Sequence, residues 1–550
     1  MRVIDAISQI LLKEGIEYLS AFPTTSVIEA AAEAGIKPII CRQERVGVGI
    51  ADGYARIKSG NPPGVFAMQY GPGAENAYPG VATAYADASP VLFLPLGHPL
   101  NKDRVFPHFN SVESFSSITK YVEQINQPET VCDTMRRAFY NLKTGRPGPV
   151  MVEIPSDIAT HEVDNNIVDS YIPAQKLTSK ANDDDILRAA KLLLQSPNPL
   201  IYAGQGLLYS NATEELTELS EITQIPVTTT MAGKGVIDER HPLALGSSSI
   251  VMNGAVRHYM LNSDTILAIG TSLTKHGMIT TIPGQKKIIH AVNDPKDIGN
   301  YYDPDIALLG DGKLVLKQLI EACKDLLPKG SIRNSPEGEI KNLKDDWLKH
   351  WNHKLTSKET PMTPYRVIWE FMNAIDPSEA IVTHDSGSPR DQIMPFYVSG
   401  GPGTYIGWGK SHGLGTGLGL NMGAKIAAPE KFVVNFMGDA AFGMTGLDFE
   451  TAVRSDIPIL TVVLNNSTMA IETSHMATSH EMYKTRDLGG DYADMAKAMG
   501  GWSEKISDPS EIRNAFLKAK RATENGQAAL LEFITSEEQD FSFRGPIKKI

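Results

Sequence analysis

The chain has 550 residues and a formal net charge of −12 at neutral pH. Hydrophobic residues make up 42% of it and charged residues 21%, which is typical of a globular protein with a large buried core. The negative charge disfavours a nucleic-acid partner or an anionic membrane surface, because both attract basic proteins. The length is too great for a single hydrophobic core, so we expect two to four domains.

The N-terminus and the cysteines indicate the compartment. Residues 1–13 carry apolar side chains three and four positions apart, which predicts an amphipathic helix and not a signal peptide. No uninterrupted apolar stretch approaches membrane-spanning length, so we expect no membrane contact. Cys41, Cys132 and Cys323 lie far apart and are odd in number, which fits a reducing environment. We therefore expect a cytoplasmic protein.

Short apolar strands alternate with helical stretches, a pattern that predicts α/β domains with mainly parallel sheets. Two polar segments interrupt this pattern. The first follows the predicted strand 149–155, and the second, roughly residues 329–363, is rich in Lys, Glu, Asn and Pro and is expected to be a solvated connection. We therefore predict three doubly wound domains, at residues 1–165, 185–325 and 360–550.

Three segments with glycine turns stand out in chain order. Residues 41–56 place Glu44 between two arginines and end in Gly-Tyr-Ala-Arg. Residues 68–76 read Met-Gln-Tyr-Gly-Pro-Gly-Ala-Glu-Asn, a predicted strand followed by a tight turn. Residues 412–424 read His-Gly-Leu-Gly-Thr-Gly-Leu-Gly-Leu-Asn-Met-Gly-Ala, a glycine-rich loop that opens a helix. Read singly, each segment also fits a purely structural role.

The most informative pattern lies in the third domain. One apolar strand runs into Gly438-Asp439-Ala440, a helix is predicted over roughly residues 442–454, and a second apolar strand runs into Asn465-Asn466. Because parallel strands end at the same edge of a sheet, the Asp439 carboxylate and the Asn466 amide oxygen are expected to lie close together. Hard divalent cations prefer oxygen ligands and share them with phosphates, so a metal–diphosphate site is predicted. Alone, the pattern also fits an ordinary β-α-β crossover.

Together these segments resemble the motifs of the thiamine-diphosphate-dependent decarboxylase and acetolactate-synthase superfamily. The resemblance covers nearly the whole chain, in the order pyrimidine-binding domain, central domain and diphosphate-binding domain. Ala440 stands where this superfamily usually has Gly, and the Gly-Leu-Gly at 413–415 is similar to the form found in benzoylformate decarboxylase. The resemblance implies thiamine diphosphate and Mg²⁺ as cofactors. It also implies a homodimer or homotetramer with the active site at the subunit interface.

The resemblance gives roles to residues of the first domain and of the glycine-rich loop. Glu44 would hydrogen-bond N1′ of the aminopyrimidine ring and so promote loss of the C2 proton, most effectively in apolar surroundings. Gly73 and Asn76 would lie beside the reacting centre, where small residues permit close backbone approach. Leu414 would wedge between the two cofactor rings, and the His412 carbonyl would accept a hydrogen bond from the 4′-amino group.

In the third domain the resemblance implies a bound Mg²⁺ ion. Its ligands would be the side chains of Asp439 and Asn466 and the backbone carbonyl of Thr468, together with diphosphate oxygens and water. The diphosphate itself would contact two short segments, one opening a helix and one following the predicted strand 380–383. These cofactor-binding residues are Gly438, Asp439, Ala440, Ala441, Ser386, Gly387 and Ser388.

The reaction depends on residues near the substrate. The segment 105–120 resembles acetolactate synthase, with Phe106 flanking the substrate, although Pro107 stands where that enzyme carries glutamine. Glu472, six residues after Asn466, has the offset of the catalytic glutamate of pyruvate decarboxylases and is a candidate proton donor. The first expectation is an acetolactate-synthase-like decarboxylating carboligase that acts on a small 2-oxo acid. A non-ligating 2-oxo acid decarboxylase or a 2-hydroxyacyl-CoA lyase is the alternative.

Other readings stay open. Predicted strands of the central domain end in glycine, as in nucleotide-binding folds, and the domain binds FAD or a nucleotide in some superfamily members, so FAD is a less favoured second cofactor. A non-catalytic structural or regulatory paralogue is the alternative from another functional class. Further candidate proton donors, each more often structural than catalytic, are His108, His384, His412 and His475.

Overall fold

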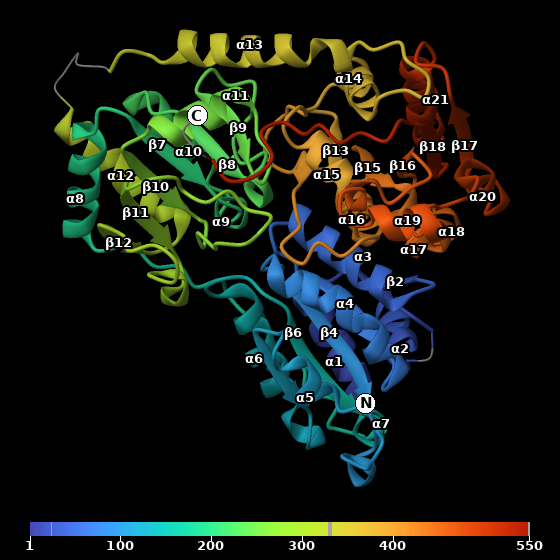
Figure 1. The fold of residues 1–550 in the computed structure, drawn as a ribbon. Helices are drawn as coiled ribbons and strands as arrows, with labels where there is room; N and C mark the ends of the chain where they lie inside the picture. The colour runs from blue at the N-terminus through green and yellow to red at the C-terminus, as the bar shows by residue number, and fades with distance from the viewer. Residues whose placement is uncertain (24, 328–332, 548–550) are drawn as a thin grey trace.

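The structure is a computed structural model that describes residues 1–23, 25–327 and 333–547. Three six-stranded sheets follow one another along these residues, and every pairing between their strands is parallel. Helices pack around each sheet (Figure 1). The prediction of three doubly wound α/β domains with mainly parallel sheets is confirmed.

The N-terminal domain is built on a sheet with the strand order β2-β1-β3-β4-β6-β5. Its strands are β1 (Tyr18–Ala21), β2 (Lys37–Ile40), β3 (Gly64–Met68), β4 (Val91–Gly97), β5 (Tyr121–Gln124) and β6 (Val150–Pro155). Its helices are α1 (Val3–Lys13), α2 (Val27–Ala34), α3 (Glu44–Ile57), α4 (Pro72–Ala86), α5 (Ser111–Phe115), α6 (Val131–Lys143) and α7 (Ser156–Thr160). The inner strands β3, β4 and β6 are buried throughout, which explains why their sequences are mainly apolar.

The central domain has the strand order β12-β11-β10-β7-β8-β9. Its strands are β7 (Pro199–Ala203), β8 (Val227–Thr230), β9 (Ala244–Ser248), β10 (Thr265–Ile269), β11 (Lys287–Val292) and β12 (Ile306–Leu309). Its helices are α8 (Asp183–Gln195), α9 (Gly206–Tyr209), α10 (Thr213–Thr223), α11 (Gly254–Asn262) and α12 (Gly312–Leu326). The sheet presents the carboxyl ends of its strands at one edge, as all-parallel sheets do.

The C-terminal domain has the strand order β14-β13-β15-β16-β18-β17. Its strands are β13 (Ala380–His384), β14 (Tyr405–Ile406), β15 (Phe432–Gly438), β16 (Leu460–Asn465), β17 (Trp502–Ile506) and β18 (Ala529–Ile534). Its helices are α14 (Pro364–Ala374), α15 (Ser388–Ile393), α16 (Thr416–Ala427), α17 (Asp439–Thr445), α18 (Phe449–Arg454), α19 (Ala477–Tyr483), α20 (Tyr492–Ala498) and α21 (Ile512–Glu524). The neighbouring strands β15 and β16 end in the two halves of the predicted metal motif.

The connection between the central and C-terminal domains differs from the prediction. Instead of a solvated segment, most of it is the helix α13 (Glu337–Leu355), which runs across both domains (Figure 1). Trp347, Trp351 and Leu355 are spaced four residues apart and are buried, so one face of this charged helix is apolar. The Trp347 ring stacks on Phe396 at a centroid distance of 4.7 Å. The expectation of a solvated connection is therefore corrected for residues 333–363, whereas residues 329–332 of the predicted segment lie outside the described residues.

The predicted helix over residues 442–454 is two helices. The short 3-10 helix η5 (Gly446–Asp448) separates α17 from α18. The Phe442 ring folds back over this point, and a Cβ on Gly446 would lie only 2.5 Å from it. The glycine therefore permits a break that the apolar periodicity of the sequence does not reveal.

Among the described residues, the most extensive contact between two helices joins the N-terminal and C-terminal domains. α3 and α16 pack backbone against backbone: a Cβ on Gly49 would lie 3.1 Å from the Gly419 Cα, and one on Gly423 would lie 2.0 Å from the Ile50 carbonyl oxygen. Contacts advance in the same direction along both helices, so their N-terminal ends lie together. Side chains around this contact form one apolar cluster drawn from both domains.

Two further expectations concern the compartment. All three cysteines are unpaired and buried, and burial raises the pKa of the Cys323 thiol to about 12. Among the described residues, no helix combines the length and apolar character needed to cross a membrane.

Gly423→Ala should lower the temperature of thermal unfolding. The added methyl group would overlap the Ile50 carbonyl and force α3 and α16 apart, which we expect to cost about 1–3 kcal/mol. Differential scanning calorimetry measures the change. Gly338→Ala in α13 is the matched control, because nothing lies within 4 Å of its added Cβ, and it should melt at or above the wild-type temperature. Equal melting of Gly423→Ala and wild type would contradict the tight contact.

Candidate active site

Glu44 is the first residue of α3 and is buried. Val46, Val48 and Ile50 of the same helix are buried as well. Burial raises the pKa of the Glu44 carboxyl, and a side-chain hydrogen bond with Asn76 opposes that rise. The environment expected for a proton-holding carboxyl is thus present at this position.

The turn after β3 brings Asn76 to Glu44. Gly71 adopts φ +60°, a conformation open to glycine, and α4 begins at the next residue, so Asn76 lies in the first turns of α4. Gly73 lies against the same carboxyl, since a Cβ there would be 3.6 Å from Glu44 Oε1. Glu44, Gly73 and Asn76 therefore share one small site.

The glycine-rich loop ahead of α16 carries His412 and Leu414. His412 has φ +41° and Gly415 has φ +86°, so the backbone bends twice within four residues. Leu414 packs against the apolar cluster between α3 and α16 and lies beside the segment 386–388, because a Cβ on Gly387 would be 3.9 Å from Leu414 Cδ2. The structure therefore brings together the predicted ring wedge and one predicted diphosphate segment.

The ends of β15 and β16 form an oxygen-rich group. Asp439 is buried, and its Oδ2 has no hydrogen-bond partner among the described residues. Burial raises the pKa of its carboxyl, while backbone N–H groups of Ala440, Ser467 and Thr468 oppose the rise. Asn466 Oδ1 accepts from the Thr468 N–H at 3.1 Å.

This group fits a divalent cation in its donor chemistry. A buried carboxylate oxygen without a partner is a site that a cation would satisfy, and an amide and a carbonyl oxygen lie on the adjoining turn. The Thr468 carbonyl also accepts from the Ala470 N–H at 2.9 Å, which leaves its second lone pair. Clusters of three or more His, Cys, Asp or Glu side chains, the usual sign of a protein-only metal site, do not occur in the described residues.

The second predicted diphosphate segment follows β13. Gly387 has φ +88°, and α15 begins at Ser388. The Ser386 N–H donates to Asp385 Oδ1 at 2.8 Å. On the other side, α17 begins at Asp439, and the Ala440 N–H donates to Asp439 Oδ1 at 2.8 Å. Two helix starts thus follow strands β13 and β15, which are neighbours in the sheet.

Two buried aspartates absent from the predicted residues hold this site. Asp385 accepts hydrogen bonds from the N–H groups of Gly415 and Gly417, and Asp87 accepts from those of Gly409 and Lys410. Asp87 also pairs with the buried guanidinium of Arg56 at 3.5 Å. No sequence motif marks these carboxylates, because their partners are mostly backbone N–H groups of distant segments. A charged residue directly after an apolar strand is the one local signal at Asp385.

The substrate-side residues lie at the surface of the chain. Phe106 is 94% exposed, and His108 stacks on His98 with a ring-centroid distance of 4.0 Å. Glu472 ends the single turn η6 (Ala470–Glu472); its side chain is 41% exposed and lies 3.8 Å from His475. The Glu472 and Phe106 assignments stay predictions.

His384 differs from the other candidate proton donors. It is fully buried at the end of β13, stacked on Trp408 at a centroid distance of 5.6 Å. Burial lowers its pKa to about 3, so the ring is neutral at ordinary pH. The environment fits a packing role for this histidine.

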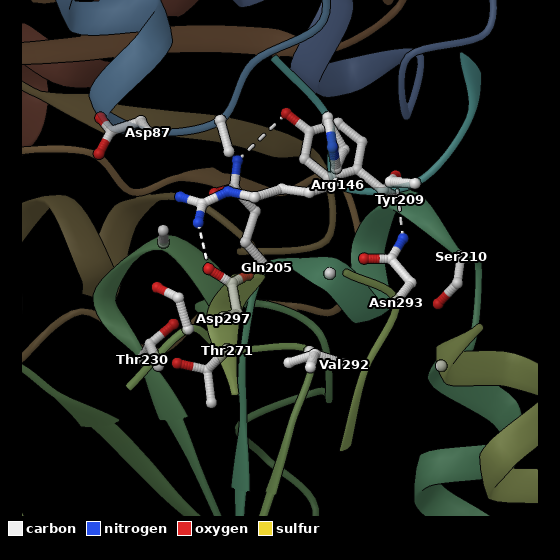
Figure 2. A pocket seen from close by; sticks show the side chains of 18 of the residues that line it. Asp87, Arg146, Gln205, Tyr209, Ser210, Thr230, Thr271, Val292, Asn293 and Asp297 are labelled. Atoms are coloured by element: carbon white, nitrogen blue, oxygen red, sulfur yellow. Dashed lines mark hydrogen bonds and ion pairs between the residues drawn. The ribbon is translucent and has the colours of Figure 1, made fainter. Parts of the chain in front are cut away.

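A cavity of about 470 Å³ lies between the central and N-terminal domains. Figure 2 shows its floor, made by residues at the carboxyl ends of central-domain strands, with Gln205, Thr230, Thr271 and Asn293 turned toward the space. An Arg146–Asp297 ion pair crosses between the two domains here. The carboxyl edge of a parallel sheet is where α/β domains bind ligands. Sequence reasoning missed the cavity because two domains build it.

Comparisons with known proteins agree with this arrangement. The family description "Thiamine pyrophosphate enzyme, N-terminal TPP binding domain" matches residues 1–125, the central domain of the same family matches residues 186–319, and "C-terminal TPP binding domain" matches residues 385–533. The glutamate site and the diphosphate segments lie within the two TPP-binding matches.

Similar curated proteins span the chain. A probable acetolactate synthase large subunit of Methanocaldococcus jannaschii is 31% identical over 97% of this chain and 92% of its own. The acetolactate synthase isozyme 3 large subunit of Escherichia coli K12 is 26% identical over 95% of this chain and 92% of its own. The acetolactate synthase large subunit of Lactococcus lactis is 27% identical over 92% of this chain and 88% of its own. The resemblance noted in the sequence is confirmed.

Proposed function

The chain belongs to the thiamine pyrophosphate enzyme family, as an acetolactate-synthase-like enzyme that forms or breaks carbon–carbon bonds, and from this premise we propose that it is a Mg²⁺-dependent decarboxylating carboligase of small 2-oxo acids. The alternative of a non-catalytic paralogue is set aside. Similarity to acetolactate synthases along nearly the whole chain supports the choice of reaction.

The observation that carries the proposal is the buried Glu44 carboxyl. Its pKa is raised by burial, and Asn76 and Gly73 flank it, so it can hold or share a proton within a protected site. Thiamine diphosphate, when bound, supplies a carbanion equivalent at C2 and an electron sink for decarboxylation. Glu44 would meet the N1′ position of that cofactor and shift its proton balance.

The remaining residues would bind and orient the cofactor. Asp439 Oδ2, Asn466 Oδ1 and the Thr468 carbonyl would hold Mg²⁺, supported by the unpartnered buried carboxylate oxygen. The segment 386–388 and the N–H groups at the start of α17 would meet the diphosphate. Leu414 would press between the two rings, with the His412 carbonyl beside it.

We further propose that the enzyme is a homodimer or homotetramer with the active site at the subunit interface. Association would remove large apolar side chains of both TPP-binding domains from water, since Phe106 is 94% exposed, Leu447 61% and Tyr483 72%. The buried, unpaired cysteines support a cytoplasmic location.

A flavin is left out of the proposal. The cavity at the carboxyl edge of the central sheet is where such a ligand would bind. The absorbance spectrum of the purified protein checks this: the visible absorbance band of a bound flavin would add FAD to the enzyme.

The reaction itself is tested with a panel of 2-oxo acids in the presence of thiamine diphosphate and Mg²⁺. We expect release of CO₂ together with a carboligated 2-hydroxy-2-oxo product, identified by mass spectrometry. An aldehyde as the sole product would favour the non-ligating decarboxylase. That alternative agrees with the position of Glu472, six residues after Asn466. No CO₂ release from any 2-oxo acid would refute the proposal.

Glu44→Gln should retain fold and cofactor binding while turnover falls by about 10²–10⁴-fold, because a carboxamide cannot exchange the proton. Steady-state kinetics and calorimetric binding of thiamine diphosphate measure the two effects. Glu29→Gln, an exposed position on α2, is the control and should behave as wild type. Turnover within threefold of wild type in Glu44→Gln, where about threefold is ordinary surface-mutation scatter, would exclude Glu44 as the activating residue.

Asp439→Asn should weaken Mg²⁺-dependent binding of thiamine diphosphate by at least about tenfold, because a neutral amide replaces the only carboxylate among the proposed ligands. Titration calorimetry at several Mg²⁺ concentrations measures it. Asp456→Asn is the control: it lies exposed after α18 with φ +54°, a conformation that asparagine tolerates. Unchanged Mg²⁺ dependence in Asp439→Asn would remove it from the metal site.

A further inference from the structure

The loop that carries Leu414 is held at both ends by buried carboxylates from outside the loop. At its beginning, the N–H groups of Gly409 and Lys410 donate to Asp87 at 3.1 and 3.3 Å. At its end, the N–H groups of Gly415 and Gly417 donate to the two oxygens of Asp385, both at 2.8 Å. Between these anchors the His412 backbone is in the left-handed region, so the shape of the loop is imposed by its contacts.

Asp385 is the anchor nearer to the wedge. It follows β13, is 0% exposed, and accepts a third backbone hydrogen bond from Ser386 at 2.8 Å. One carboxylate therefore joins the loop of Leu414 to the segment 386–388 that would meet the diphosphate. Burial raises the pKa of this carboxyl to about 6, and the three N–H groups and Arg45 oppose the rise.

Arg45 extends this link to the helix that begins with Glu44. Arg45 is half-buried, its Nη2 is buried without a hydrogen-bond partner among the described residues, and a Cβ on Gly415 would lie 3.1 Å from that nitrogen. Burial lowers the pKa of this guanidinium, and the charge of Asp385 opposes that fall. The Asp385 carboxylate thus accepts hydrogen bonds from backbone N–H groups of the wedge loop, and it also interacts electrostatically with Arg45 at the start of α3.

Both oxygens of the Asp385 carboxylate accept hydrogen bonds from the wedge loop. Each accepts from a different glycine N–H, so both must be acceptors for the loop to keep its shape. Thr445 makes the matching contact on the carbonyl side, where its Oγ1 donates to the Gly415 oxygen at 3.1 Å. That contact is neutral and single, which makes it a suitable comparison.

We propose that Asp385 is a positioning residue, which holds the loop 409–417 in the shape that places Leu414 between the cofactor rings. The proposal rests on the proposed function for the role of Leu414. The geometry of the loop itself stands on the hydrogen bonds alone.

Asp385→Asn is the first test. The carboxamide presents an N–H₂ group to one of the two glycine N–H groups, so one anchor is lost while the size of the side chain is kept. We expect kcat to fall by about 10²-fold, as for a misplaced reacting geometry, while KM and the affinity for thiamine diphosphate with Mg²⁺ change by less than about fivefold. Thr445→Val should stay within about threefold of wild type in all three quantities.

The split between kcat and binding separates positioning from general loss of structure. A kcat of Asp385→Asn within threefold of wild type would overturn the proposal, taking about threefold as ordinary scatter. So would parallel losses of kcat, cofactor affinity and melting temperature that Thr445→Val reproduces. If Asp385→Asn does not fold, Asp385→Ser replaces it, because the smaller side chain leaves room for water beside the two N–H groups.

A second readout does not need the cofactor. Hydrogen–deuterium exchange of the peptide covering 409–417 should be at least about tenfold faster in Asp385→Asn than in wild type, and unchanged in Thr445→Val. If wild type fails to bind thiamine diphosphate, the proposed function falls, and faster exchange would still support Asp385 as the anchor of the loop. Unchanged exchange in Asp385→Asn would refute the anchor whatever the cofactor does.

Discussion

The structure depends on one close contact, the backbone-to-backbone packing of α3 against α16. Gly49, Gly419 and Gly423 remove the side chains that would hold these helices apart. The two helices run in the same direction, so their N-terminal ends meet. Glu44 begins the first, and the loop of Leu414 leads into the second. Within one chain, the separation of these two segments is therefore fixed by main-chain atoms, whose close packing leaves little room for movement.

The buried carboxylates at the site accept hydrogen bonds mainly from backbone N–H groups. Asp385, Asp439 and Asp87 all accept from main-chain donors, and burial raises the pKa of the first two. Fixed donors of this kind are already oriented before a ligand arrives, so little reorganisation is needed on binding. The Asp439 oxygen that lacks a donor is the exception, and it is the one proposed to meet Mg²⁺.

The sequence predicted what periodicity and local motifs encode. The three parallel sheets follow from mainly apolar strands that alternate with helices, and the ends of β15 and β16 meet because these strands are neighbours. Longer-range features were missed. The charged residues of α13 masked an apolar face made by three side chains, and Gly446 breaks a helix because of the fold-back of Phe442. Asp385 and Asp87 bind main-chain groups far away in sequence, and a hydrogen bond to backbone leaves no residue pattern to find.

The path of the chain beyond β18 has a consequence for how the molecule unfolds. Ser542 bonds with the backbone of Met252 in the central domain and accepts from Trp347 Nε1 of α13, and the Gly545 N–H donates to Ile250. The central and C-terminal domains are thus tied together twice, once by α13 and once by this returning segment. Because two separate segments connect them, neither domain can unfold without breaking contacts that it makes with the other. We therefore expect these two domains to unfold as one cooperative unit, which the N-terminal domain contacts through α3, the buried Arg56 group and the Arg146–Asp297 ion pair.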